Sequence, residues 1–334
     1  MKRRLHIVGS GKRVLETALP VLKSATDWEL AGISSRRARR ITNGTEEFDV
    51  TALDILDADT LANVDLVYLV VAKPAVPDVL QRLAPHVPAK CELLIETPVM
   101  LFKHLGYLDR LEAFRRVWVS EDCFTLPCWD PLRATGERFT SAHFDHSAYS
   151  YHGVAMARAV LGNARVRAAR SDAVGRRVSF DGGASFTTRE PRDYRVGRFS
   201  AEGSGLPVAD HDPGREHRRL AALGTTDELV GFRLDDAEHE LSTTERAVVG
   251  APGEGDGMFR WMDGMKRVGF LRLLDALAHG RPAYALDDAL EDAVVDYWLH
   301  RVGRYRATAL TDPRRGAARL CYRLLTKAAG LRRS

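Results

Sequence analysis

A loop with two glycines near the N-terminus has the residue types and spacing that bind a dinucleotide. The apolar run Leu5–Val8 predicts a short strand, the loop follows it, and a helical pattern begins at Val14. A strand, such a loop and a helix place a pyrophosphate at the positive end of the helix, where backbone N–H groups point at it. The alternative is an ordinary strand-to-helix turn, since Val14 stands where a third glycine would be. The residues predicted to bind the cofactor phosphates are Gly9, Ser10, Gly11, Lys12 and Arg13.

The end of the second predicted strand, Glu29–Ile33, indicates which dinucleotide would bind. NAD recognition normally uses an Asp or Glu at this place, hydrogen-bonded to the ribose 2′-hydroxyl. Here Ser34, Ser35, Arg36 and Arg37 follow the strand and no acid is present. Hydroxyls and guanidinium groups fit a 2′-phosphate, because arginine offers a charge-assisted fork. We therefore predict that Ser35, Arg36 and Arg37 bind NADP in preference to NAD, the alternative being a solvated basic helix start.

The first 122 residues alternate strands with helices. The run Asp65–Val71 is continuously apolar, which is typical of a strand covered on both faces in a parallel sheet. Alternation at this spacing predicts βαβ units and a Rossmann dinucleotide-binding domain over residues 1–122. Further strands are expected at Glu92–Ile95 and Val117–Ser120, and helices at Val76–Leu83 and Phe102–Phe114.

The pattern changes after Asp122, where strand candidates follow one another. A run of sequential strands predicts an α+β domain with a mostly antiparallel open sheet over residues 123–334, for substrate binding and dimerisation. The polar segment Gly203–Gly224 is expected to be a long loop, and the tail after Asp312 a basic amphipathic helix. Such a helix packs on its own domain more often than on a membrane or an acidic partner. Strands are predicted at Arg138–Phe144, Arg165–Arg170, Arg177–Phe180, Ala184–Thr188, Tyr194–Phe199 and Glu228–Leu234, and helices at Tyr151–Leu161, Met258–His279 and Leu286–Val302.

Composition narrows the class of protein. The 334 residues fit two domains, and 45% hydrophobic with 28% charged residues describes a globular chain. A net charge of +4 predicts no nucleic-acid partner, and no apolar run is long enough to predict a membrane span or a signal peptide. The four cysteines and the histidines lack metal-ligand spacing, so we predict reduced thiols, no metal and a cytoplasmic location.

The sequence resembles the glucose–fructose oxidoreductase, inositol dehydrogenase and rhizopine-catabolism (Gfo/Idh/MocA) family over most of its length. The resemblance rests on the glycine loop, the strand Asp65–Val71 with its turn, the strand end Leu94–Pro98 and the helix Tyr151–Leu161. It implies that Glu96 and Pro98 shape the nicotinamide pocket. It also implies that Ala72 and Pro74, in the turn after the third strand, contact the cofactor.

Two positions depart from the family pattern. Thr97 stands where the family has a lysine that polarises the substrate, and Ala148 where it has an Asp before the catalytic histidine. The resemblance assigns that histidine to His152, the general acid or base, although a lone histidine at a helix start is ordinarily a solvated or capping residue. Thr97 could hydrogen-bond the substrate but supplies no charge. Groups that could compensate are Glu121, Asp122, Asp145, His146, Tyr149 and Tyr151.

These residues predict an NAD(P)-dependent oxidoreductase that transfers hydride between nicotinamide and a C–O or C=N carbon of a small polar metabolite. A biosynthetic pathway would fit the altered motif. The resemblance implies a homo-oligomer, a dimer or tetramer. Two alternatives stay open. One is a catalytically silent nucleotide-binding scaffold or partner protein, and the other is a redox-neutral enzyme that retains its nucleotide.

Overall fold

The computed structural model describes residues 2–148, 150–281, 284–313 and 315–331, and the chain divides into two compact units. Unit 1 contains Met1–Glu121, Phe270–Ala293 and Ala309–Ser334. Unit 2 contains Asp122–Gly269 and Val294–Thr308. The C-terminal part of the chain therefore contributes to both units, and the predicted division after residue 122 stays a prediction.

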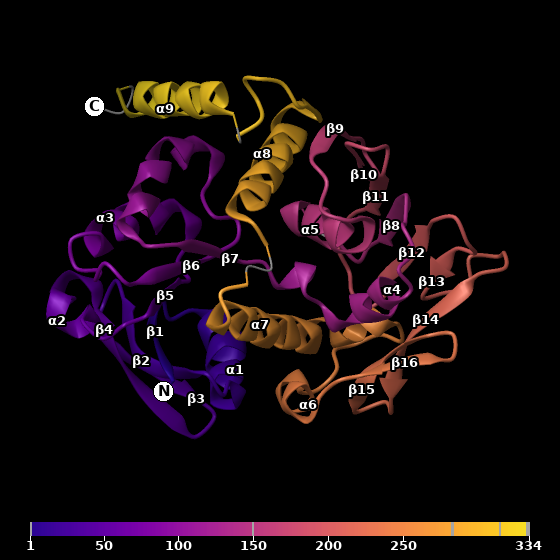
Figure 1. Cartoon of the computed structure of the whole chain (residues 1–334), viewed down its shortest axis with the longest axis horizontal. Coiled ribbons are helices and arrows are strands. Elements are labelled where there is room, and N and C mark those ends of the chain that lie inside the picture. The colour runs from indigo at the N-terminus through magenta and orange to yellow at the C-terminus, as the bar shows by residue number, and fades with distance from the viewer. Residues whose placement is uncertain (1, 149, 282–283, 314, 332–334) are drawn as a thin grey trace. The chain divides into compact units, whose positions relative to one another are not determined.

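Unit 1 is built on a predominantly parallel sheet with the strand order β3-β4-β2-β1-β5-β6-β7 (Figure 1). Strand β3 is antiparallel to its neighbour β4, and the other paired neighbours in the sheet run parallel. This confirms the predicted Rossmann-like α/β sheet. The strands are β1 (Arg3–Val8), β2 (Trp28–Ser35), β3 (Arg39–Asn43), β4 (Glu46–Ala52), β5 (Leu66–Leu69), β6 (Glu92–Glu96) and β7 (Val117–Ser120).

Burial of the central strands explains their composition. All residues of β5 are buried, and Leu5, Ile7 and Val8 of β1 are fully covered, so the apolar runs read from the sequence lie within the sheet. Helix α3 buries one apolar face, as its spacing requires. The helices of this unit include α1 (Leu19–Ser24), which continues a π-helical turn Val14–Ala18, α2 (Ala58–Leu61), α3 (Val76–Leu83), the 3-10 helix Phe102–Ala113 and α9 (Gly316–Leu331).

The strands β3 and β4 form a hairpin that the sequence analysis missed. Asn43 pairs with Glu46 across the turn, and Gly44 adopts a φ of 61° that favours glycine. The Asn43-Gly44 dipeptide is a hairpin signal, but the surrounding charged residues hide the strand pattern. The segment Phe102–Ala113 also differs, because it is a 3-10 helix with a kink at Tyr107.

Unit 2 is built on a second sheet with the order β16-β15-β14-β13-β12-β8-β11-β10-β9-β17. Its pairs are antiparallel except β8 with β11 and β13 with β14, which confirms a mostly antiparallel sheet. The strands are β8 (Ser141–Asp145), β9 (Val166–Ser171), β10 (Gly175–Phe180), β11 (Ser185–Arg189), β12 (Arg198–Glu202), β13 (Val208–Ala209), β14 (Arg218–Gly224), β15 (Leu229–Leu234), β16 (Ala237–Glu240) and β17 (Arg304–Arg306).

Aromatic rings fill the core beneath this sheet. The ring centroids of Trp129 and Phe199 lie 5.1 Å apart, and those of Phe144 and Phe199 lie 5.4 Å apart. The prediction of one long loop over Gly203–Gly224 is wrong, because β13 and β14 occur within it. Strand β14 has a single buried residue, Leu220, and so lacks the alternating pattern of a half-buried strand. The helices are α4 (Asp130–Ala134), α5 (Ser150–Leu161) and α6 (Thr243–Val249), while α7 (Met262–Ala278) and α8 (Leu286–Val302) span both units.

The basic C-terminal helix α9 packs within unit 1. Its Tyr322 ring meets Phe102 of the 3-10 helix edge-on at 5.0 Å, and the Tyr322 hydroxyl donates to the carbonyl of Thr311. Arg319 pairs with Asp287 at 2.9 Å. Residues 314 and 332–334 of the predicted tail lie outside the described residues. Within the described ranges, no helix has both the length and the apolar character that crossing a bilayer requires.

Candidate functional site

The carboxyl ends of β1, β2, β5 and β6 meet at one edge of the unit 1 sheet because these strands are parallel. Strand β1 lies between β2 and β5. The chain passes from β1 to β2, β3 and β4 on one side of β1 and then crosses to β5 on its other side, so the strand order reverses beside β1. Such a switch point opens a crevice in which ligands of this sheet type bind. The glycine loop and the Ala72–Pro74 turn follow strands that end here, and Glu96 is the last residue of β6.

The structure accounts for the two glycines of the loop in different ways. Gly9 has a φ of 136°, and a Cβ atom there would lie 1.9 Å from the carbonyl oxygen of Val70. Packing of the protein therefore requires a glycine at this position. A Cβ atom at Gly11, in contrast, would have no neighbouring heavy atom within 4 Å. The open space beside Gly11 is what a phosphate group approaching the backbone needs.

The two cations of the loop lie in different environments. The Lys12 ammonium is 82% exposed and pairs with Glu16 at 3.5 Å. The Arg13 side chain is largely covered: its Nε lies 3.5 Å from Glu96 Oε1, and its guanidinium lies over the Phe270 ring. Lys12 thus extends into solvent, whereas Arg13 is held at the Glu96 carboxylate.

Glu96 joins this arginine to a buried tyrosine. The Tyr68 hydroxyl donates to Glu96 Oε2 and lies 3.4 Å from Ser120 Oγ. Burial, followed by the nearby Glu96 charge, raises the pKa of Tyr68, so this hydroxyl keeps its proton. The Glu96 carboxylate is therefore oriented by one donor from the sheet and one cation from the loop.

The arginines after β2 form the basic side of the site. Arg36 and Arg37 are exposed, and among the described residues neither guanidinium has a hydrogen-bonding or ion-pair partner. Ser35 Oγ donates to the carbonyl of Arg37 and fixes the turn. Arg39 Nη2 donates to the carbonyl and to Oγ of Ser10, both at 2.6 Å. Arg39 thus links the predicted phosphate loop to the predicted 2′-phosphate segment, a contact that the sequence analysis missed.

Lys73 is a second residue of the site that the sequence analysis did not select. It lies between the predicted residues Ala72 and Pro74, which are both exposed. Its Nζ donates to the carbonyl of Glu96 at 2.6 Å, which uses one of the three ammonium protons. Burial lowers the pKa of Lys73 to about 8, since desolvation disfavours the ammonium more than Glu96 stabilises it.

Thr97 and Pro98 follow β6 directly, joined by a cis peptide bond. The Thr97 side chain is only 6% exposed, and its Oγ1 donates to the carbonyl of Ser120 at 3.3 Å. The hydroxyl proton is thus used within the protein.

His152 belongs to unit 2, in the first turn of α5. Its ring is half-buried, and its centroid lies 4.2 Å from that of Tyr151. Ala148 is buried, so no carboxylate occupies that place. Asp145 pairs with Arg189 at 3.6 Å, and His146 Nδ1 donates to the carbonyl of Pro191. Of the remaining candidates, Glu121 and Asp122 are buried and Tyr149 lies outside the described residues.

Comparison with known proteins identifies relatives by structure. The sequence matches no model of a protein family and no curated protein. An oxidoreductase from Thermotoga maritima is similar at a TM-score of 0.59 and 14% identity, over 92% of this chain and 98% of that one. A levoglucosan dehydrogenase in complex with NADH has a TM-score of 0.59 and 11% identity, over 92% and 100%. A myo-inositol 2-dehydrogenase from Lactobacillus plantarum has a TM-score of 0.56 and 11% identity, also over 92% and 100%. At these identities the likeness shows the fold.

Proposed function

We propose that this chain, which has the fold of the Gfo/Idh/MocA oxidoreductases, is an NAD(P)-dependent oxidoreductase acting on a small polar metabolite. The observation that carries the proposal is the glycine loop at the switch point. Gly9 is needed by packing, while the exposed Gly11 leaves open space beside the backbone in which a phosphate would fit. The levoglucosan dehydrogenase of the same fold was crystallised with NADH, which supports a nicotinamide cofactor.

The chemistry would be hydride transfer between the nicotinamide ring and a C–O or C=N carbon of the substrate. The protein's own residues would bind the cofactor and move the accompanying proton. His152 would take that proton from the substrate oxygen or nitrogen during oxidation, and return it during reduction. Thr97 would accept a hydrogen bond from the substrate, and the Lys73 ammonium would donate one.

Fluorescence titration of the purified chain with NADPH and with NADH tests the proposal. Saturable binding of either nucleotide is expected, followed by oxidation or reduction of the nicotinamide in a screen of sugars, polyols and imines. Binding without turnover of any candidate would favour the second function, a silent nucleotide-binding scaffold. Thr97 and Ala148 favour that alternative, since neither supplies the charge of the corresponding family residue.

The finer parts of the proposal rest on the sequence. They are a preference for NADP, a role in biosynthesis, a dimer or tetramer of this chain, and a cytoplasmic location. Arg36 and Arg37 support the first of these because both guanidinium groups are exposed and available to a phosphate.

Cofactor choice gives the first prediction. Arg36→Asp or Arg37→Asp should weaken NADPH binding roughly 10- to 100-fold, because one charge-assisted contact contributes about 1.5–3 kcal/mol. NADH binding should change far less, since NADH carries no 2′-phosphate. The Kd values from fluorescence titration check this, with Arg82→Asp on α3 as the control. Equal affinity of the parent protein for both nucleotides would contradict the preference.

The ammonium of Lys73 gives the second prediction. Lys73→Met should lower kcat roughly 10- to 100-fold, the size of one lost hydrogen bond from a charged group, and leave the cofactor Kd nearly unchanged. The working form is protonated, and its pKa of about 8 means that the parent should lose activity as pH rises through that value. The basic limb of the pH–rate profile should be absent in Lys73→Met.

A lysine that pairs on the surface provides the matched control. Lys90→Met removes an ammonium whose partner is Asp65, and it should leave both kcat and the pH profile as they are. Adding Thr97→Lys to Lys73→Met should restore part of the lost kcat. The new lysine follows Glu96, whose carbonyl accepts the hydrogen bond from Lys73 in the parent, so a cation returns to this region. A basic limb that persists in Lys73→Met would assign it to another group.

A further inference from the structure

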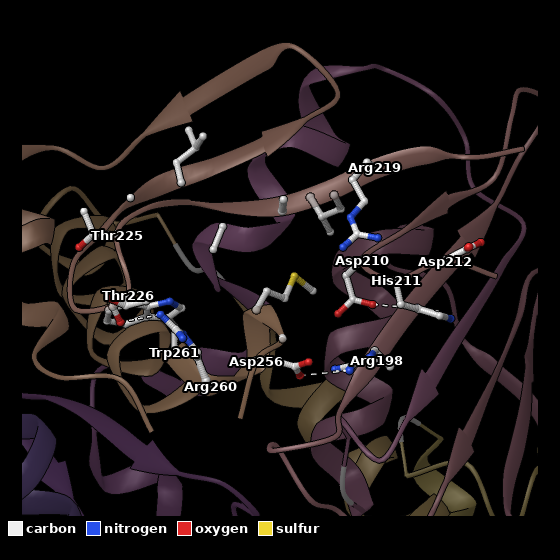
Figure 2. Close-up of a pocket in the computed structure, with 17 residues that line it drawn as sticks. Arg198, Asp210, His211, Asp212, Arg219, Thr225, Thr226, Asp256, Arg260 and Trp261 are labelled. Atoms are coloured by element: carbon white, nitrogen blue, oxygen red, sulfur yellow. Dashed lines mark hydrogen bonds and ion pairs between the residues drawn. The ribbon is translucent and has the colours of Figure 1, made fainter. Parts of the chain in front are cut away.

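Unit 2 contains a cavity of about 650 Å³ that the proposed hydride transfer does not use (Figure 2). Strand β14 forms one wall, and residues of β12, the segment after β13 and the turn before α7 form the others. Its volume lies in the range of sites for small metabolites. Met258 and Trp261 line it and are themselves buried, so part of the wall is apolar.

Asp210 lines this cavity and has one carboxylate oxygen without a hydrogen-bond donor. Its side chain is at least nine-tenths buried, and its Oδ1 accepts hydrogen bonds from the Phe199 N–H at 2.8 Å and from His211 Nδ1 at 3.0 Å. Its Oδ2 is buried without a hydrogen-bonding partner. Figure 2 shows this second oxygen turned toward the cavity, away from His211. A buried carboxylate oxygen left without a donor costs about 1–3 kcal/mol, so the site is built to receive one.

Three arginines line the same cavity and differ in what holds them. Arg198 pairs with Asp256 at 3.2 Å. Arg260 donates to the carbonyl of Thr226 and lies over the Trp261 ring. Arg219 is exposed, and within the described part of the chain its guanidinium has no ion-pair or hydrogen-bonding partner. Figure 2 shows it reaching from β14 toward Asp210, so an unpaired cation lies near the unpaired carboxylate oxygen.

The charges around the cavity decide the kind of ligand. Three aspartates, Asp210, Asp212 and Asp256, balance the three arginines. A wall of zero net charge gives no advantage to a simple anion or a simple cation. It fits a molecule whose opposite charges are separated, because each charge then meets its own partner.

We propose that this cavity binds a small zwitterion of the α-amino acid class, whose ammonium donates to Asp210 Oδ2 and whose carboxylate pairs with Arg219. The ammonium would supply the donor that Oδ2 lacks, and the carboxylate would accept from the guanidinium fork. The side chain of the ligand would lie against Met258 and Trp261. Binding here is independent of nucleotide binding in unit 1, so either proposal can fail without the other.

Titration of the full chain with L-alanine, L-leucine and L-serine tests the site, using isothermal calorimetry and ligand-observed NMR. At least one of them should bind saturably. Propylamine, which lacks the carboxylate, and N-acetyl-L-alanine, which lacks the ammonium, should each bind at least tenfold more weakly. Propionate binding as well as the amino acids would show an anion site and overturn the proposal, as would the absence of saturable binding by all three amino acids.

Two variants test whether the amino acid binds at Asp210 and Arg219. Asp210→Asn keeps an oxygen for the Phe199 N–H but places an NH₂ group where Oδ2 was, so the ligand ammonium would meet a donor instead of an acceptor. Arg219→Gln removes the cation from an exposed side chain. Each should weaken amino acid binding at least tenfold at an unchanged melting temperature. The matched controls Asp236→Asn and Arg233→Gln alter exposed residues outside the cavity and should bind as the parent does. If Asp210→Asn unfolds, Arg219→Gln decides alone, and its unchanged affinity would overturn the assignment.

Discussion

Replacing His152 with alanine is expected to lower kcat by roughly 10²- to 10⁴-fold, the range for the loss of a general acid or base. The imidazole would move the proton that accompanies hydride transfer, and Ala148 leaves it without the carboxylate that the family resemblance would place four residues before it. Cofactor Kd should stay within about twofold, because the nucleotide would be bound by residues of unit 1. Steady-state kinetics and nucleotide titration on the same preparation measure both quantities.

A histidine on the surface of the same unit serves as the control. His300 is exposed near the end of α8, and His300→Ala should keep the parent's kcat. If His152→Ala retained full activity, the proton would come from elsewhere. Tyr151, whose ring touches His152, is the next residue to vary. A loss of kcat accompanied by an equal loss of nucleotide affinity would instead indicate a structural role for His152.

The fold could be predicted where the burial of a strand determines which of its residues are apolar. Strands covered on both faces, such as β1 and β5, leave continuous apolar runs, so the parallel sheet of unit 1 could be recognised. The hairpin β3–β4 at the sheet edge was not, because half of its strand residues are exposed and both strands begin with charged pairs. Strand β14 was also missed, because Leu220 is the one buried residue among its seven and no alternating pattern results. A strand with exposed side chains can lack a hydrophobic pattern, since backbone hydrogen bonds to the neighbouring strands stabilise it.

The site could be predicted where backbone geometry sets the residue type. Gly9 is such a position, since its positive φ and the nearby Val70 carbonyl require a glycine, while the binding role of Gly9 and Gly11 stays a prediction. Arg39 and Lys73 could not be selected in this way, because their roles depend on contacts with Ser10 and Glu96 that lie far away in the chain. The carboxylate oxygen of Asp210 is a further case, since only three-dimensional structure shows that it lacks a donor.

Replacing Gly11 with valine is expected to abolish binding of both NADPH and NADH, with Kd raised roughly 100-fold or more. A branched side chain would fill the open space beside this residue, where a pyrophosphate would approach the backbone. The fold should be retained, because a Cβ atom there meets no atom of the protein within 4 Å and the backbone φ lies outside the left-handed region. Fluorescence titration and the melting temperature measure the two effects separately.

The neighbouring glycine makes the matched comparison. Gly9→Val would force a side chain into the carbonyl of Val70 at a φ of 136°, so this variant should lose stability and expression. The two substitutions should therefore have different effects. Gly11→Val should lose nucleotide binding, and Gly9→Val should lose folding. A Gly11→Val protein that binds NADPH as tightly as the parent would mean that no pyrophosphate lies on this loop. The proposed oxidoreductase function would then lose the observation that carries it.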